Sequence, residues 1–299
     1  MSKSKFKREF PLHMMLLPSV IVVLIYSYGP MLGISMAFQK FIPARGMIGQ
    51  EWVGFNNFRS LFATPDFVQV VFNTVYMAFF KLAGGIIVPV LFALLLNEVA
   101  QVRVKRLFQT LVYLPNFLSW VILSGLMIDL LSPSTGIFNL FITKLGFEAI
   151  YFLGDKNWFP ITMIVSDIWK GFGFGTVVYL AALTGIDPAL YEAARVDGAN
   201  RWRQTLHITL PGMKGIVVLM SVLSFGNLMN AGFDQIYNLY SPQVYSTGDI
   251  LDTLVYRLGI QQAQYSVATA IGLFKSVISS VFVVMSYYLA DQFAGYRIF

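Results

Sequence analysis

The sequence contains no cysteine, which excludes disulfides and thiolate metal sites. Histidine occurs only twice, as His13 near an expected helix start and as His207 in a polar segment. Two isolated histidines do not predict a metal site. Charged residues make up only 12 % of the 299 positions, whereas soluble globular proteins carry about 25 %. The chain is therefore not expected to be a soluble globular protein.

Short motifs of nucleotide and hydrolytic chemistry are also absent. The sequence has no G-x-x-x-x-G-K-[ST], so we expect no nucleotide binding of the P-loop kind. It has neither H-E-x-x-H nor G-x-S-x-G. An enzyme is thus a poor fit, and transport, channel and scaffold roles remain.

Apolar residues dominate what is present, at 57 % of the chain. A transmembrane helix needs about 20 mainly apolar residues. Six stretches meet that need, and they predict an all-α membrane protein with six transmembrane helices at 13–38, 70–97, 108–131, 159–184, 213–233 and 265–291. Within the fourth stretch, GFGFG (Gly171 to Gly175) has the small-residue spacing that allows close helix contact, and ordinary glycine frequency is an equal alternative.

The N-terminus combines a basic start with an apolar run, as a signal peptide does. The apolar run is too long for that, and no small-residue cleavage site follows it. We expect an uncleaved first span.

Lysine and arginine predict the orientation of the spans. Of the 21 basic residues, 12 fall on the side of the N-terminus, six on the opposite side and three within spans. Positive residues concentrate on the cytoplasmic side of membrane proteins. Both termini are therefore expected in the cytoplasm, in a multi-pass protein of the cytoplasmic membrane.

One segment between two expected spans is polar. YEAARVDGANRWRQTLHITLP (Tyr191 to Pro211) holds three arginines, two acids and a histidine. Asp187 can cap a helix that starts at Pro188, and Gly198 permits a sharp turn into a second helix that ends at Pro211. Two short helices would form a rigid cytoplasmic knob suited to a groove on a partner. A solvated loop is the alternative, but it would need none of the apolar residues Ala193, Leu206, Ile208 and Leu210.

The same segment carries a longer pattern: E-A-A, three residues, G, nine residues, I-x-L-P. It resembles the signature of permease subunits of binding-protein-dependent ABC importers. The stretches HMMLLPSVIVVLIYSYGPMLGISMAFQKF, WVGFNNFRSLF and NAGFDQIYNLYSPQVY extend the resemblance over essentially the whole chain. They look like the carbohydrate-uptake branch, and more narrowly like permeases for polysaccharides and uronate-type oligosaccharides.

The resemblance implies the type I ABC importer permease fold. It divides the chain into a first span with an outer interfacial segment (1–68), a permease core (69–291) with a coupling loop at 185–211, and a cytoplasmic tail (292–299). Contact with a separate ATPase would fall to Glu192, Ala193, Ala194, Asp197, Gly198, Ile208, Leu210 and Pro211.

The resemblance also implies the partners. The chain would be a non-catalytic subunit without a cofactor of its own, since ATP and Mg²⁺ would bind two cytoplasmic ATPase subunits. A second homologous permease, an extracytoplasmic solute-binding protein and membrane lipid would complete the assembly, with no role for nucleic acid. It would import an oligosaccharide, neutral or acidic, by alternating access.

Four polar residues predict where the sugar passes. Asn227, Asn230, Asp234 and Asn238 are spaced by three, four and four residues, which places them on one face of a helix. Such a stripe would face a water-filled path, where amides and a carboxylate can bind sugar hydroxyls. Hydrogen bonding between helices is the alternative.

Three lysines lie near the middle of expected spans. Lys170 has Asp167 one turn away, so this pair can neutralise itself. Lys81 and Lys275 have no acid nearby in the sequence. Unpaired lysines in a cavity would favour an anionic sugar, and we count Lys170 and Lys275 with the predicted pathway. Snorkelling or pairing across helices is the more frequent arrangement.

A self-sufficient ion-coupled carrier or channel is the rival function. Such proteins often contain internal repeats with broken helices. The sequence shows no clear repeat and no matching pair of carboxylates.

Overall fold

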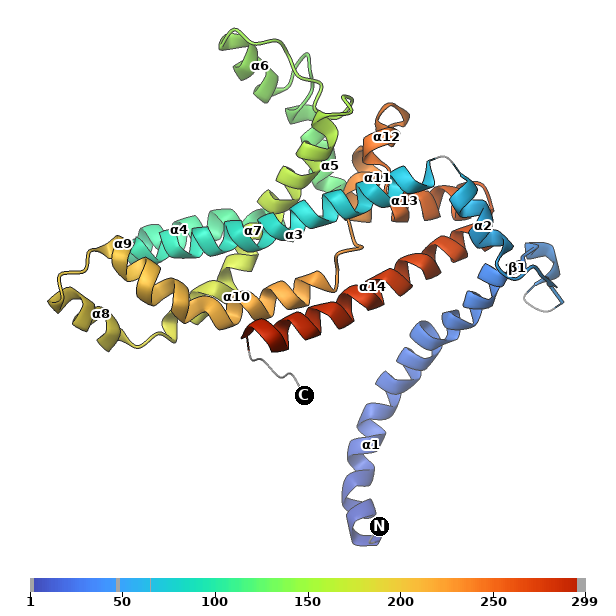
Figure 1. The fold of residues 1–299 in the computed structure, drawn as a ribbon, viewed down its shortest axis with the longest axis horizontal. Helices are drawn as coiled ribbons and strands as arrows, with labels where there is room; N and C mark the ends of the chain where they lie inside the picture. Colours follow the sequence, from blue (N-terminus) through green and yellow to red (C-terminus); the bar gives the residue numbers. More distant parts are fainter. Residues whose placement is uncertain (1–2, 47–48, 65, 295–299) are drawn as a thin grey trace. The chain divides into compact units, whose positions relative to one another are not determined.

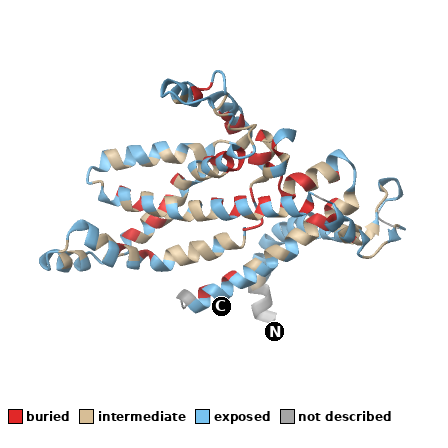
Figure 2. Ribbon diagram, turned by 45° about the horizontal axis from the view of Figure 1, so that its top comes forward, coloured by how far each residue is buried: buried red, intermediate tan, exposed pale blue. Residues whose placement is uncertain are grey.

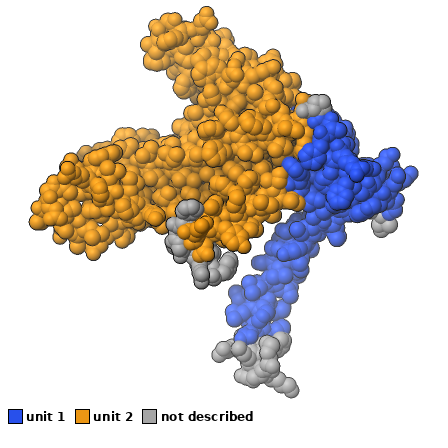
Figure 3. Space-filling view, in the orientation of Figure 1, with its two compact units in different colours: residues 1–64, 255–274 blue, residues 65–254, 275–299 orange. Residues whose placement is uncertain are grey.

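The structure is a computed structural model that describes residues 3–46, 49–64 and 66–294, and these are mostly helical (Figure 1). The chain divides into two compact units (Figure 3). Unit 1 comprises residues 1–64 and 255–274, and unit 2 comprises 65–254 and 275–299. The three-part division expected from the sequence stays a prediction, and most of its C-terminal tail lies outside the described residues.

Unit 1 begins with the first span. Helix α1 (Lys3–Val23) continues through a π-helical turn (Leu24–Tyr28) into a 3₁₀ segment (Gly29–Phe38). The run Glu9–Phe38 is long and apolar enough to cross a membrane, which confirms the predicted span. The rest of unit 1 consists of β1 (Gln39–Lys40), a 3₁₀ turn (Pro43–Arg45), β2 (Glu51–Trp52), α2 (Asn56–Ala63), a π-helical turn (Arg257–Gln261) and the first ten residues of α14 (Tyr265–Ala294).

Aromatic packing holds the small hairpin of unit 1 together. Strands β1 and β2 are antiparallel, with Gln39 opposite Trp52. The Phe38 ring stacks on Trp52 at a centroid distance of 5.7 Å, and the Asn57 side chain donates to the Gln39 carbonyl at 3.0 Å. These contacts fix the chain where it leaves the first span.

Unit 2 contains most of the long helices. Their order follows the chain: α3 (Phe67–Glu98), α4 (Val102–Tyr113), a 3₁₀ turn (Leu114–Phe117), α5 (Trp120–Leu130), α6 (Ile137–Lys144), α7 (Trp158–Thr184), α8 (Pro188–Val196), α9 (Arg201–Gln204), a π-helical turn (Thr205–Thr209), α10 (Leu210–Phe225), α11 (Phe233–Leu239), a 3₁₀ turn (Pro242–Val244), α12 (Tyr245–Gly248), α13 (Leu251–Tyr256) and the remainder of α14.

Helices α3 and α7 pack against each other and carry much of the core of unit 2. Met77 on α3 and Met163 on α7 are fully buried in one apolar cluster. The contact is close: a Cβ on Gly84 would lie 2.1 Å from Ile168 Cδ1. Many residues on the long helices are exposed (Figure 2), and on α3 and α7 these include apolar ones such as Phe79 and Val165, as expected for surfaces that face lipid or another subunit.

The glycine-rich stretch of α7 fulfils its prediction only in part. A Cβ on Gly173 would lie 2.1 Å from the Val112 carbonyl oxygen of α4, and one on Gly175 would lie 3.3 Å from Pro89. A Cβ on Gly171 would meet open space within the described residues. Close approach therefore needs glycine at Gly173, where the neighbour is backbone that cannot move aside.

Five described helices are long and apolar enough to span a membrane, or six if one bent pair is a single span. That pair occupies the third predicted stretch, where we expected one helix over 108–131. Instead Val102–Phe117 and Trp120–Leu130 meet at 104°. Pro115 lacks an N–H for the helical ladder, and Ser119 caps a new helix by accepting from the Ile122 N–H at 3.4 Å.

Candidate functional site

The first helix of the polar insert forms as predicted. Asp187 Oδ1 accepts from the Ala189 N–H at 2.9 Å and caps α8. The helix ends at Val196, and Gly198 just after it has a φ of +77°, which belongs to the left-handed region. There the Ala199 N–H donates to the Ala194 carbonyl at 2.8 Å, and the Gly198 N–H donates to Arg195 at 3.1 Å. This is the Schellman pattern that glycine permits at a helix end.

The second helix differs from the prediction. Asn200 Oδ1 caps α9 by accepting from the Arg203 N–H at 2.9 Å. The helical path then continues from Arg201 to Phe225 without a break. The expected boundary at Pro211 is wrong, because a proline fits in the first turn of α10, and the wider π-helical turn before it accommodates the missing N–H. The insert is thus a direct extension of the next span.

Two polar contacts fasten the insert to long helices of unit 2. The hydroxyls of Tyr191 and Thr209 lie 3.0 Å apart and join α8 to the start of α10. Arg201 on α9 forms a 2.7 Å ion pair with Glu98 at the end of α3. Both groups of this ion pair are exposed, so it contributes little to stability. The Tyr191–Thr209 contact ties α8 to the start of α10, and the ion pair links α9 to α3.

Most residues of the family signature are accessible. Glu192, Ala193, Gly198 and Pro211 are exposed, as is the neighbouring Asp197, whereas Ala194, Ile208 and Leu210 are half-buried. Contact between these residues and an ATPase stays a prediction.

Three further apolar residues of the insert were missed by the sequence reasoning. The exposed fractions are 52 % for Leu190, 88 % for Val196 and 69 % for Trp202. The available signal was their apolar character within a polar segment. They add hydrophobic area to the exposed surface around the signature residues.

The polar stripe predicted on the fifth span is not continuous. Helix α10 ends at Phe225, and α11 begins at Phe233 after a turn formed by 226–232. The chain changes direction at Gly232, whose φ is +90°. The prediction of one helical face is therefore wrong.

The four stripe residues divide between the turn and α11. Asn227 and Asn230 lie exposed in the turn, and Asn230 Oδ1 accepts from the Gly232 N–H at 3.3 Å. Asp234 lies exposed on α11, where the half-buried Asn238 donates to its backbone carbonyl at 2.6 Å. Asn227, Asn230 and Asp234 thus retain accessible polar groups close together in the chain.

Two of the three lysines within the spans form ion pairs with carboxylates on other helices. Lys81 Nζ lies 3.7 Å from Asp167 Oδ1, with Lys81 only 7 % exposed. Lys275 Nζ lies 2.5 Å from Asp252 Oδ1, and both side chains are about one-fifth exposed, at 22 % and 23 %. The expected pair of Asp167 with Lys170 is wrong, because Asp167 points to the neighbouring helix α3. Because Lys275 is paired with Asp252, it no longer supports the prediction that an unpaired lysine recognises an anionic sugar.

Lys170 has different surroundings. Its Nζ donates to the Asn116 carbonyl at 3.1 Å and lies 5.6 Å from the centre of the Trp120 ring. Within the part of the chain that the structure describes, no carboxylate forms an ion pair with it. Its side chain is half-buried beside the α4–α5 break. Lys170 therefore keeps a net positive charge that a ligand could use.

Comparison with known proteins decides the family. Residues 85–294 match the family described as "Binding-protein-dependent transport system inner membrane component". The chain belongs to this family. It is a permease subunit of the bacterial cytoplasmic membrane, as the resemblance of the insert motif predicted, and its structure confirms the all-α, type I importer permease fold.

Relatives of known function cover nearly the whole permease. It is 42 % identical to the polygalacturonan/rhamnogalacturonan transport system permease protein YteP of Bacillus subtilis (strain 168), over 94 % of this chain and 88 % of that protein. A crystal structure of a bacterial ABC transporter involved in the import of the acidic polysaccharide alginate contains a chain that matches with a TM-score of 0.90 at 40 % identity, over 97 % of this chain and 98 % of that one. The same comparison finds the alginate transporter bound to a periplasmic protein that holds an alginate pentasaccharide, with a TM-score of 0.89, 40 % identity and coverage of 97 % and 96 %.

Proposed function

We propose that this permease imports an acidic oligosaccharide built from uronate-type sugars. The observation that carries the proposal is the match over nearly its full length to a chain of the alginate importer, at a TM-score of 0.90 and 40 % identity. The similarity to a polygalacturonan/rhamnogalacturonan permease supports the same substrate class. Alginate is described as an acidic polysaccharide.

The permease acts with separate subunits that hydrolyse ATP. The proposed assembly contains a second, similar permease, two ATPase subunits and an extracytoplasmic solute-binding protein. The complex of the alginate importer with its periplasmic protein supports the last of these. This chain binds no nucleotide, metal or cofactor and catalyses no reaction, and ATP with Mg²⁺ binds the ATPase subunits.

The polar insert transmits motion from the ATPase to the spans. Its exposed surface carries Glu192 together with the apolar Val196 and Trp202, a combination suited to a partner's groove. Because α9 runs without a break into α10, displacement of the insert moves a span directly. Closure of the ATPase dimer would thus draw the inserts together and open the path outward.

The sugar is bound along the break between α10 and α11. Asn227, Asn230 and Asp234 offer accessible amide and carboxylate groups for hydroxyls. Lys170 supplies a positive charge for a carboxylate of the sugar. Asp234 carries the same sign as the substrate, so it is suited to hydroxyls and not to the carboxylate.

Uptake by the purified complex in lipid vesicles tests the proposal. The expected result is ATP-dependent entry of a uronate oligomer that requires both the ATPase and the solute-binding protein. A neutral oligomer of equal length should enter more slowly. Transport by this chain alone, without ATP, would identify a self-sufficient carrier and overturn the assignment of subunits.

A further inference from the structure

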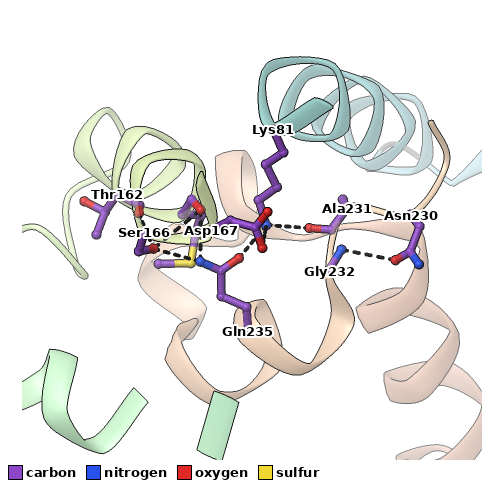
Figure 4. Close-up of polar contacts among 9 residues, drawn as sticks. Lys81, Thr162, Ser166, Asp167, Asn230, Ala231, Gly232 and Gln235 are labelled. Atoms are coloured by element: carbon purple, nitrogen blue, oxygen red, sulfur yellow. Dashed lines mark hydrogen bonds and ion pairs between the residues drawn. The ribbon is translucent and has the colours of Figure 1, made fainter. Parts of the chain in front are cut away.

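A buried polar cluster in unit 2 surrounds the ammonium of Lys81 (Figure 4). Its members come from three places in the chain: Lys81 from α3, Ser166 and Asp167 from α7, and Gln235 from α11. The cluster lies beside the turn 226–232 that separates α10 from α11. None of its members belongs to the family signature or to the sugar-binding residues proposed above.

Lys81 forms a direct hydrogen bond with the backbone of the turn. Its Nζ donates to the Ala231 carbonyl at 2.7 Å and also to the side-chain oxygen of Gln235. The Asp167 carboxylate lies 3.7 Å away and supplies the opposite charge. Burying an ammonium in an apolar region is costly unless it is paired and hydrogen-bonded. Here both conditions are met, and one of the acceptors is the backbone of the turn.

Gln235 connects this ammonium to α7. It is fully buried, and its amide nitrogen donates to the Met163 carbonyl at 2.9 Å and to Ser166 Oγ at 2.8 Å. Because its oxygen accepts from Lys81, the whole amide group is occupied. The start of α11 is thereby held at a fixed distance from both α3 and α7.

The turn is shaped to admit the ammonium. At Gly232 a Cβ would lie 3.1 Å from Lys81 Nζ, and the φ of +90° strains any other residue. Ala231 is fully buried, whereas its neighbour Asn230 is exposed. One side of the turn is thus anchored at Lys81, and the other side presents Asn227 and Asn230.

We propose that Lys81 is a positioning residue for transport: by holding the Ala231 carbonyl it places the exposed amides of Asn227 and Asn230 on the sugar path. Asp167 compensates the charge, and Gln235 joins the anchor to α7. The role of the two amides in sugar binding rests on the proposed function. The placement of the turn by Lys81 does not.

Two roles of Lys81 must be separated experimentally. If it only neutralises Asp167, then replacing both residues by neutral ones should leave the turn in place. If it positions the turn, the same double change should release the turn even when the protein assembles normally. The comparison therefore uses Lys81→Met together with Asp167→Asn.

The chain has no native cysteine, so a single introduced cysteine can be labelled to measure the accessibility of the turn. Asn230→Cys gives this chain one thiol, whose rate of reaction with a membrane-impermeant methanethiosulfonate is measured in the complete complex in vesicles. In the double variant we expect assembly close to that of the parent and a labelling rate changed by about tenfold. In the same double variant with Asn230 retained, the KM for uptake, normalised to assembled complex, should rise by about tenfold.

The matched control is the second, partly buried ion pair of unit 2, between Lys275 and Asp252. Lys275→Met with Asp252→Asn also removes one opposite-charge pair, but away from the contacts of Ala231. It should leave the labelling rate at Asn230→Cys unchanged. A tenfold change in this control as well would show a general loosening of the helices and overturn the proposal.

Two further outcomes decide the matter. A double variant with the parent's labelling rate and KM would show that Lys81 only balances charge. If the double variant does not assemble, Lys81→Arg replaces it. The charge is kept, while the planar guanidinium changes the geometry of the donors that reach the Ala231 carbonyl. An unchanged labelling rate in Lys81→Arg contradicts the proposal. Since labelling requires no sugar, failure of uronate uptake by the parent complex would refute the proposed function and not the position of the turn.

Discussion

The hydroxyls of Tyr191 and Thr209 lie 3.0 Å apart, and this contact joins the helix that bears the E-A-A motif to the start of a membrane span. Thr209 is buried and Tyr191 is half-buried, so water competes only partly for the bond. A bond in this position ties the orientation of α8 to that of α10.

Removing that contact should weaken coupling more than stability. Tyr191→Phe deletes one hydroxyl and is expected to cost about 0.5–1.5 kcal/mol. The number of sugars imported per ATP hydrolysed should fall, with the yield of complex unchanged. Tyr288→Phe, on a side chain that is 74 % exposed on α14, is the control. An unaltered ratio of import to hydrolysis in Tyr191→Phe would show that the hydroxyl pair is not part of the coupling path.

Gly198→Val should uncouple transport while the protein still inserts in the membrane. The φ of +77° at Gly198 costs roughly 1–2 kcal/mol for a residue with a side chain, although the space around it is open. The end of α8 must then change direction, so the signature residues no longer face the ATPase together. Gly215→Val on α10 adds the same side chain in open space without a positive φ and should have a smaller effect. Normal uptake by Gly198→Val would refute the role of the turn.

Glu192→Ala tests whether this carboxylate forms a charge-assisted hydrogen bond with a basic residue of the ATPase. The Glu192 side chain is exposed on α8 and accessible to a basic group of a partner. Loss of a hydrogen bond to a charged group costs about 1.5–3 kcal/mol, which corresponds to roughly 10- to 150-fold weaker association. Binding of the ATPase to the permease in vesicles measures this effect, with Glu148→Ala as an exposed control in the 145–157 loop. Equal affinities for both variants would remove Glu192 from the interface.

Sequence reasoning found those parts of the molecule that are specified locally. The cap at Asp187 and the turn at Gly198 depend on residues within a few positions, and both form as predicted. The apolar spans follow from length and composition alone. The break after Pro115 and the end of α10 at Phe225 were missed, because membrane helices tolerate proline and glycine when neighbouring helices satisfy the backbone.

Contacts between distant segments could not be predicted in the same way. Asp167 was assigned to Lys170 because the two are one turn apart, yet it faces Lys81 on another helix. Gln235 gave no signal at all, since a single glutamine near a polar turn is ordinary. Its importance comes from the packing of α3 and α7, which only the folded chain reveals.

Asn230→Ala and Asp234→Ala should lower uptake without reducing assembly. Both side chains are exposed and close to the turn, where they can bind sugar hydroxyls. Each lost hydrogen bond should cost about 0.5–1.5 kcal/mol, or roughly 2- to 13-fold in apparent affinity, and more at the charged Asp234. Asn238→Ala is a matched control, because its amide already donates to the Asp234 carbonyl within α11. Lower yield and Tm with unchanged uptake per assembled complex would instead indicate hydrogen bonding between helices.

Lys170→Gln should reduce the preference for acidic over neutral oligosaccharides. Among the three lysines of the spans, Lys81 and Lys275 have carboxylate partners, whereas the contacts of Lys170 are a carbonyl oxygen and the Trp120 ring. These contacts hold its side chain without cancelling its charge. Glutamine keeps most of the side-chain length and a donor for the Asn116 carbonyl, so the α4–α5 break should remain folded.

The measurement compares uptake of a uronate oligomer with that of a neutral oligomer of equal length. The uronate should lose about 10- to 150-fold in apparent affinity, the scale of a hydrogen bond to a charged group, while the neutral sugar loses much less. Lys144→Gln, on an exposed side chain at the end of α6, controls for a general change in charge. Lys275→Gln separates specificity from stability. It leaves the half-buried Asp252 without its cation, so it should reduce the amount of assembled complex and lower total uptake of both sugars equally. Equal losses of apparent affinity for both sugars in Lys170→Gln would show that Lys170 does not recognise the charge of the sugar. The membership of the permease family would be unaffected.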